Sequence, residues 1–473
     1  MATDGRAMPF ELVPRVPPGD LEMLLGAIGR VPGGALSWQR HESQQPQDGF
    51  ARLGLHCALC FDGPCRVSPF ANGRGHEGAE YGVCGFDGPG MSMAVLLRAA
   101  AAGLAALAPH VRREPLLAAA GELLAAASPG AGTAVSLADC LVRVCRGVAA
   151  AIAAETFVVD SAGRAAMGDL AARGQRLAVG LGHLDPSRPR VLVSGPALAP
   201  SREALQEILR ASGCAVQVVV PAGAGGSLLP GLPTVIDGPS VELLSLARLI
   251  HARIELRSDG RAADSGEVAG KLDAAKAAFH ARPWSVPFEP GDCTSVSLAP
   301  WHRPAGRQLL IAGSSRVRSP RGRGGIHRAA GAEARELGWS PVGLGDAAFY
   351  LAQDGEAAGP CAASLPAGLA VALRAGSAAA QGPAAIAALF PEPVQHAELA
   401  CALLLAAGGI QTHVAGQLPL GPAAGEALTG AFGCALSLGP PPEPAAGRVA
   451  ARVVLDAVRG WLTGLREPGG TSG

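Results

Sequence analysis

The hydrophobic residues of the first third of the chain recur at helical spacing. From Ser92 to about Gln175, leucines and alanines return every three or four positions, as on the buried face of an amphipathic helix. The clearest groups are Leu96, Leu97, Leu104 and Leu107, followed by Leu116, Leu117, Leu123 and Leu124. Segments 131–154 and 162–174 continue the pattern. The sequence therefore predicts an all-helical first domain, which we place at residues 1–187.

After Pro189 the pattern changes to short apolar runs that end at glycine or a polar residue, which is typical of buried strands. Strands are expected at 191–195, 216–220, 235–237, 254–256, 308–313, 342–344 and 411–414. Helices are expected between them at 202–211, 240–251, 329–337 and 397–407. Because strands and helices alternate, the chain is predicted to be a multidomain α/β protein. Two Rossmann-like, doubly wound α/β domains are expected at 188–300 and 301–473, with a linker at Pro283–Pro304.

Composition and charge limit which binding partners and which cellular compartment are expected. The chain has 473 residues with 39 Lys and Arg against 39 Asp and Glu, so its formal net charge is +0. This balance gives no electrostatic reason to expect a nucleic-acid or membrane partner. No secretory signal or membrane span is recognised, and the chain is expected to be cytoplasmic. Most of its eleven cysteines are scattered, as in proteins of a reducing compartment.

Four cysteines near the N-terminus have the spacing of metal ligands. Cys57, Cys60 and Cys65 form a C-x2-C-x4-C run, and Cys84 follows. Four thiolates are the ligand set of a [4Fe–4S] cluster or of structural zinc, and spacing alone leaves both open. Glycines, which let a loop curl around a metal centre, flank these ligands at Gly63, Gly82 and Gly85.

The residues around these cysteines resemble the catalytic subunit of anaerobic nickel–iron–sulfur carbon monoxide dehydrogenases, relatives of the hybrid-cluster proteins. The resemblance is carried by 36–40, 44–47, 63–70 and 82–85, and a fainter collinear likeness extends to Leu465. It implies an oxidoreductase architecture with one [4Fe–4S] cluster on Cys57, Cys60, Cys65 and Cys84. It also implies a homodimer and a ferredoxin-like electron-transfer partner.

The chain departs from this family where the family holds its nickel–iron active cluster. Five cysteines and a histidine of the α/β domains bind that cluster, and the aligned positions here carry other residues. These positions are Ser194 to Pro196, Val220 to Pro221, Ile236, Ser314, Asp346 and Ala378, and Ala397 stands at the catalytic lysine position. The resemblance therefore implies a divergent member without nickel, and no catalytic residue is assigned.

A second departure concerns the cluster that the family shares across its homodimer. The two cysteines that each subunit contributes correspond here to Asp48 and His56. Because iron–sulfur clusters depend on thiolate donors, no bridging cluster is expected. The other cysteines are interpreted as ordinary apolar residues, although a rearranged metal site among the five C-terminal ones is an alternative. They are Cys140 and Cys145 in the helical region and Cys214, Cys293, Cys361, Cys401 and Cys434 further on.

The leading hypothesis is an iron–sulfur redox protein in which one [4Fe–4S] cluster transfers electrons and CO is not oxidised. CO chemistry requires a coordinatively open metal held by soft thiolates, which Ser314, Asp346 and Ala378 do not provide. One alternative is an oxidoreductase with an altered active site in the α/β cleft, lined by Asp346, Ser314 and the basic segment 316–328. The other is a non-redox assembly partner with a structural cluster.

Overall fold

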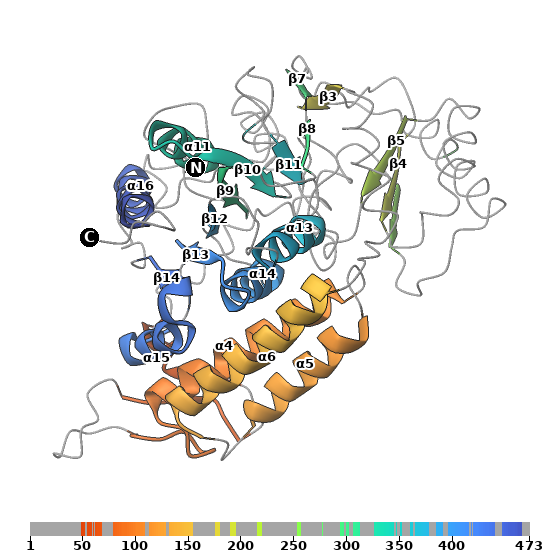
Figure 1. Cartoon of the computed structure of the whole chain (residues 1–473). Coiled ribbons are helices and arrows are strands. Elements are labelled where there is room, and N and C mark those ends of the chain that lie inside the picture. The colour runs from red at the N-terminus through yellow and green to blue at the C-terminus, as the bar shows by residue number, and fades with distance from the viewer. Residues whose placement is uncertain are drawn as a thin grey trace, which may run out of the picture.

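The computed structural model describes most of the helices and strands expected from the sequence, together with several that were not expected. The described residues are 49–52, 54–58, 60, 62–68, 79–108, 113–128, 132–154, 176–179, 190–194, 215–219, 253–256, 277, 294–297, 299–301, 306–312, 326–344, 347, 351, 360–362, 365–377, 385–390, 396–415, 418, 420–439 and 447–465. Within them, a group of long helices lies beside a parallel sheet that has helices on both faces (Figure 1).

Three long helices form the N-terminal layer, as the hydrophobic period predicted. They are α4 (Gly88–Leu107), α5 (Arg113–Ala126) and α6 (Ala134–Ala154). Helix α4 begins sharply because the Asp87 side chain accepts a hydrogen bond from the Gly90 N–H at 2.8 Å. Among the described helices, α4 is long and apolar enough by composition to cross a membrane, but it is mostly buried inside the protein. The prediction for 162–174 lies outside the described residues.

The largest sheet is parallel throughout and has seven strands in the described part of the chain. Its order is β14-β13-β12-β9-β10-β11-β8. The strands are β8 (Ala299–Pro300), β9 (Arg307–Ile311), β10 (Ser340–Leu344), β11 (Pro360–Ala362), β12 (Ala385–Phe390), β13 (Gln411–Val414) and β14 (Leu436–Leu438). Predicted strands 308–313, 342–344 and 411–414 are confirmed as β9, β10 and β13.

Helices cover both faces of this sheet, and the side chains of its central strand alternate between them. Leu309 and Ile311 belong to a core with α11 (Ile326–Glu336) and α16 (Gly447–Gly464). Leu310 belongs to the opposite core, with α13 (Leu365–Ser377) and α14 (His396–Ala407). Helix α15 (Pro422–Phe432) and the short turn η4 (Gly433–Ala435) precede β14. A sheet buried on both faces is what a doubly wound α/β unit requires, so the mixed α/β class is confirmed.

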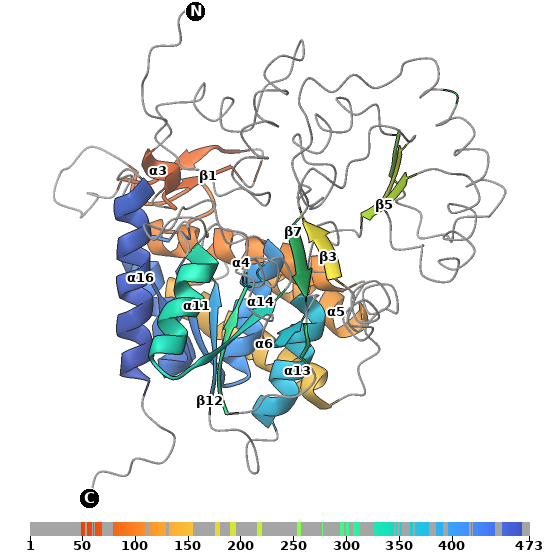
Figure 2. The ribbon, with the colours of Figure 1, turned by 90° about the horizontal axis from the view of Figure 1, so that it is seen from above.

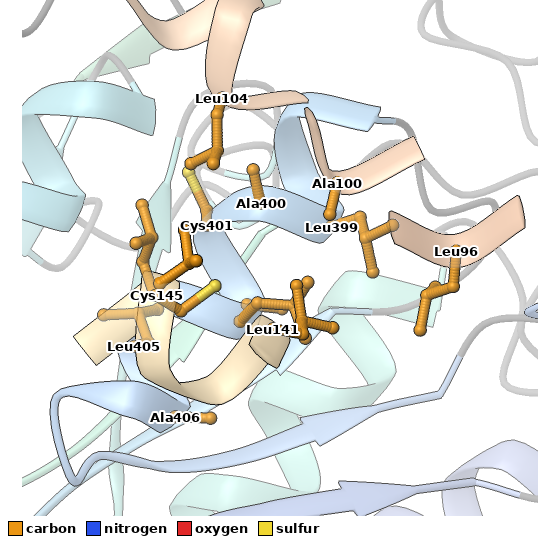
Figure 3. Packing of buried hydrophobic residues seen from close by; sticks show 14 of the residues in the cluster. Leu96, Ala100, Leu104, Leu141, Cys145, Leu399, Ala400, Cys401, Leu405 and Ala406 are labelled. Atoms are coloured by element: carbon orange, nitrogen blue, oxygen red, sulfur yellow. The ribbon is translucent and has the colours of Figure 1, made fainter. Parts of the chain in front are cut away.

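The N-terminal helices and the sheet share one hydrophobic core. Figure 3 shows side chains of α4, α6 and α14 packed together, with Ala400 and Leu405 of α14 beside residues of the other two helices. The helices approach closely at Gly103 of α4, where an added Cβ would clash with the carbonyl oxygen of His396. Apolar packing therefore joins the helical layer to the α/β part, in addition to the covalent connection of the polypeptide.

Two smaller sheets lie between these parts in sequence. A parallel sheet of order β5-β4-β6 contains β4 (Arg190–Ser194), β5 (Ala215–Val219) and β6 (Arg253–Leu256), which confirms three predicted strands. Strand β3 (Arg176–Val179) pairs antiparallel with β7 (Thr294–Ser297). The predicted strand at 235–237 and helices at 202–211 and 240–251 lie outside the described residues.

Two expectations are wrong. Residues 1–187 were predicted to be all-helical, but the strands β1 (His56–Cys57), β2 (Cys65–Arg66) and β3 lie within them, because pairing with another segment decides the structure of these short stretches. The segment Pro283–Pro304 was predicted to be a linker, but β7 and β8 lie within it, and β8 pairs with β11. Trp301 is buried and donates its indole N–H to the side-chain oxygen of Gln308 at 3.0 Å. Because these residues are part of sheets and core, they cannot serve as a free connection. The division of the chain into domains at residues 187 and 300 stays a prediction. Strand β3 pairs with β7 across the first of these boundaries, and β8 pairs with β11 across the second.

Candidate metal centre

A two-stranded ribbon holds the first and third cysteines directly opposite each other. Strand β1 (His56–Cys57) pairs antiparallel with β2 (Cys65–Arg66), with Cys57 across from Cys65 and His56 across from Arg66. Helix α3 (Gly49–Arg52) precedes the ribbon (Figure 2). Because successive side chains of a strand point to opposite faces, the thiols of Cys57 and Cys65 share one face. His56 lies on the other face, next to Arg66.

The turn between these strands curls tightly around Gly63. A Cβ at that position would lie 3.3 Å from the Cys57 carbonyl oxygen, 3.3 Å from the Cys65 nitrogen and 3.4 Å from the Cys60 carbonyl oxygen. The Gly63 N–H also donates to the Cys60 carbonyl at 3.3 Å. Three of the four predicted ligands therefore have their backbones packed around one glycine, as the sequence suggested.

The fourth cysteine lies in a compact turn that adjoins the ribbon. Cys84 sits inside a loop closed by two hydrogen bonds of 2.8 Å, from Gly82 N to Phe86 O and from Gly85 N to Gly82 O. A Cβ at Gly82 would lie 3.6 Å from the Cys84 sulfur and 3.7 Å from the Cys65 Cβ. We call Cys57, Cys60, Cys65 and Cys84 the four-cysteine site.

One backbone donor of this turn already points at a ligand sulfur. The Val83 N–H donates to the Cys65 sulfur at 3.4 Å. Such N–H···S contacts stabilise thiolate ligands and tune the potential of iron–sulfur clusters. Sequence reasoning missed Val83, because any residue except proline has a backbone N–H and the residue type therefore does not reveal this donor. Its role depends on the folded turn.

The start of helix α4 anchors the turn. The Met91 side chain lies beneath Gly82, where an added Cβ would meet its methyl carbon at 2.9 Å. The Ser92 hydroxyl donates to the Gly54 carbonyl at 2.9 Å, which ties α4 to the segment before β1. Arg66 packs its guanidinium over the ring of Phe50 at 5.8 Å. Both halves of the four-cysteine site are thus fixed against the same helix end.

The site is closed on one side and open on another. Cys65 is 9% exposed, Cys57 and Cys84 are half-buried, and Cys60 is exposed. The side chain of Val83 is 70% exposed even though its backbone contacts Cys65. A group bound here would be shielded from water on the Cys65 side and accessible on the Cys60 side.

The donor set consists of four cysteines, which can bind either one zinc ion or an iron–sulfur cluster. Within the described residues, no group of three or more His, Cys, Asp or Glu side chains converges closely enough to hold one metal ion. Thiolates on one zinc ion would lie about 3.8 Å apart, as Zn–S bonds of about 2.3 Å at tetrahedral angles require. Four thiolates with an N–H aimed at one sulfur are also a ligand set for a [4Fe–4S] cluster, whose several irons separate the thiolates more than one zinc ion does.

The other cysteines that the structure describes lie elsewhere. Cys145 and Cys401 are fully buried in the shared core, where desolvation raises the pKa of Cys145 to about 12 and that of Cys401 well above its usual value. Cys140 is half-buried and accepts a hydrogen bond from Arg143 at 3.5 Å, and Cys434 is exposed. The prediction of a core residue is therefore confirmed for Cys145.

Most positions of the predicted nickel site lie outside the described residues. These are 195–196, 220–221, 236, 314, 346 and 378. Asp48, Cys214, Cys293 and residues 316–323 of the basic segment also lie outside the described residues. Ser194 ends β4, and Ala397 lies in the first turn of α14. The adjacent parallel strands β9 and β10 end at Ile311 and Leu344, a few residues before Ser314 and Asp346 in the sequence.

The chain is similar to carbon monoxide dehydrogenases in part of its sequence and in its fold. No protein-family model matches the chain. Over 76 residues it is 47% identical to the carbon monoxide dehydrogenase of Rhodospirillum rubrum, a match that covers 16% of this chain and 11% of the relative. Over 85 residues it is 42% identical to carbon monoxide dehydrogenase 1 of Carboxydothermus hydrogenoformans, covering 18% and 13%. Each match spans only a small part of the relative's length.

Solved structures extend the likeness to the whole fold. A nickel-free crystal structure of carbon monoxide dehydrogenase from Thermococcus sp. AM4 matches with a TM-score of 0.63 and 16% identity, covering 99% of this chain and 100% of that one. Carbon monoxide dehydrogenase IV from Carboxydothermus hydrogenoformans matches with a TM-score of 0.62 and 15% identity, covering 96% and 100%. The resemblance predicted from the sequence is therefore confirmed: the chain has the fold of the carbon monoxide dehydrogenases and is similar to them in sequence over 76 to 85 residues.

Proposed function

We propose that this chain is an iron–sulfur redox protein of the carbon monoxide dehydrogenase type that carries one [4Fe–4S] cluster on the four-cysteine site. The observation that carries the proposal is the packing of Cys57, Cys60 and Cys65 around Gly63, with Cys84 brought alongside by the turn at Gly82. When bound, such a cluster supplies one-electron transfer. The chain holds it with four thiolates, donates the Val83 N–H to one of them and excludes water from the Cys65 side.

We further propose that the chain does not oxidise CO. That reaction needs a coordinatively open metal held by soft ligands. At the aligned positions this chain has Ser314, Asp346 and Ala378, which provide no thiolate. An altered active site in the α/β cleft, with Ser314 and Asp346 around a different substrate, is the alternative on the enzyme side. Extra bound metal in the purified protein would favour it.

A structural role for the cluster is the second candidate, and one observation favours it. Cys65, Val67 and Phe86 belong to the same apolar core as α4, so the site is part of the packed interior rather than an appended loop. Metal binding at such a site adds to folding stability. A cluster that cannot be reduced or reoxidised without unfolding the protein would support this role over electron transfer.

The assembly and location are also proposals. We propose a cytoplasmic homodimer held by protein contacts alone, which exchanges electrons with a ferredoxin-like carrier. His56, at one of the two bridging positions, lies on the ribbon face opposite Cys57 and next to the cation of Arg66. Asp48 and His56 supply a carboxylate and an imidazole instead of thiolates, and iron–sulfur clusters depend on thiolate donors, which supports the absence of a bridging cluster. The native mass and iron content of Asp48→Ala/His56→Ala should match those of the unmodified protein.

The deciding experiment is metal analysis of the full chain purified without oxygen. We expect about four irons and four sulfides per chain, no stoichiometric nickel or zinc, and a paramagnetic signal after reduction with dithionite. Cys65→Ser should lose the iron, whereas Cys434→Ser, which removes an exposed cysteine elsewhere, should keep it. One zinc per chain, or CO oxidation above the blank after nickel loading, would contradict the proposal.

A further inference from the structure

The four cysteines of the site are not held equally. Cys65 is in a strand, is 9% exposed and accepts the Val83 N–H. Cys57 is paired across from it in the ribbon, and Cys84 is enclosed by the closed turn that includes Gly82 and Gly85. These three residues are fixed by backbone hydrogen bonds and packed against the shared core.

Cys60 differs from them in position and access. It lies in the connection between β1 and β2, and its carbonyl takes part in the 3.3 Å turn bond from Gly63. Its side chain is exposed, whereas those of Cys57 and Cys84 are half-buried. Cysteine reactivity follows thiolate character and access, so this thiol meets dissolved reagents and competing ligands first.

We propose that Cys57, Cys65 and Cys84 form a preorganised three-thiol site and that Cys60 is the exchangeable fourth ligand, through which the bound group enters and leaves. The inference rests on the proposed function, since it concerns the same site. Its physical basis is that a ligand fixed before binding costs little ordering entropy, whereas an exposed one in a turn can detach and rejoin at small cost. A thiol from solution or from a cluster-carrying protein is the chemical class that would replace Cys60.

Chemical rescue of alanine variants is the sharpest test. Full-length Cys60→Ala and Cys65→Ala are reconstituted anaerobically with iron and sulfide, with and without 2-mercaptoethanol. We expect Cys60→Ala to keep at least half of the wild-type iron and to change its paramagnetic spectrum when the thiol is added. We expect Cys65→Ala to fall at least fivefold in iron and to show no response. Equal loss of iron in both variants, or rescue of Cys65→Ala alone, would overturn the proposal.

A second measurement does not need the bound group. In the metal-free full chain, iodoacetamide should alkylate Cys60 at least tenfold faster than Cys65, as followed by peptide mass spectrometry. Cys434 serves as an exposed reference thiol. Equal labelling of Cys60 and Cys65 in folded protein would overturn the inference. If the wild-type chain binds no iron while the labelling order holds, the proposed function fails and the ranking of the thiols stands.

Discussion

Gly103 of α4 lies directly against the main-chain carbonyl of His396, the first residue of α14. A Cβ at Gly103 would lie 2.7 Å from the carbonyl carbon of His396 and 2.8 Å from the Cβ of Ala400. The two helices therefore approach closely only because this position has no side chain. The contact joins the helix that begins at the four-cysteine site to a helix that covers the parallel sheet.

Gly103→Ala should therefore destabilise the protein, because the backbone of α14 must move to make room. Overpacking of a well-packed core costs about 1–3 kcal/mol in the free energy of unfolding. Gly121→Ala in α5 is the matched control, since a Cβ there meets nothing within 4 Å and should be neutral or stabilising by about 0.5–1 kcal/mol. Urea unfolding of both variants measures the difference. Equal stability of the two would mean that α4 and α14 do not pack as described.

Val83→Pro removes the N–H that points at the Cys65 sulfur, and we expect it to lower the reduction potential of the loaded protein. A hydrogen bond to sulfur stabilises the more negative reduced state, so its loss favours the oxidised state. The expected decrease is on the order of 60 mV, which corresponds to a factor of ten for a one-electron couple. Val83→Ala keeps the N–H and should leave the potential unchanged in the same titration. A similar decrease in both variants would assign the effect to the exposed side chain.

His413 should make the folded state less stable in acid. It is buried in β13, stacked on Trp461 with ring centroids 5.1 Å apart, and burial lowers its pKa to about 4. In the unfolded chain the His pKa is near 6.5. Between pH 6.5 and 4 the unfolded chain therefore binds a proton at His413 and the folded state does not, so the free energy of unfolding falls as pH drops through this range. The loss from this group reaches about 3 kcal/mol. Urea unfolding at a series of pH values measures this loss. As pH falls from about 6.5 to 4, the free energy of unfolding of His413→Gln should rise by that amount relative to wild type. A difference between the two proteins that does not change with pH would exclude this titration.

Cys145 and Cys401 should resist alkylation until the protein unfolds. Both are buried, and desolvation raises the pKa of both thiols, to about 12 for Cys145. Because the thiolate is the reactive form, iodoacetamide at pH 8 should label Cys434 in minutes and leave these two below about 5% modified. Peptide mass spectrometry with and without urea distinguishes them. Labelling of Cys145 at the rate of Cys434 in native protein would show that the core opens readily.

Sequence patterns located elements whose hydrophobic signal is local. Runs such as 191–195 and 308–313 end at glycine, and the observed strands β4 and β9 begin one residue earlier and end one or two earlier. Strand β12 was missed because Ala385–Phe390 contains no polar residue, so its period does not separate a strand from a buried helix. Helix α13 was missed for a related reason, since its small residues give a weak period. Packing across the sheet decides both cases.

The candidate site was predictable as far as spacing determines it. The C-x2-C-x4-C run, the flanking glycines and the family resemblance predicted the four cysteines as ligands, and the structure packs the backbones of three of them around Gly63. The opposite orientation of His56 and Cys57 depends on the register of β1 with β2, and the Val83 donor depends on the geometry of the turn. The unequal exposure of Cys60 and Cys65 arises from packing against α4, which connects residues far apart in sequence. Such features follow from tertiary contacts that a local pattern does not contain.

The core that α4 and α6 share with α14 bears on how this protein can have changed over time. If residues 88–154 were separated from the rest, the apolar faces that α14 now covers would meet water. The N-terminal helices and the four-cysteine site that α4 anchors therefore do not form an independent domain that recombination can transfer intact to another protein. Substitution of residues that line the α/β half, by contrast, leaves the packing of α4 and α6 against α14 unchanged. Point substitutions can therefore alter a site in the α/β half while the four-cysteine site stays in place.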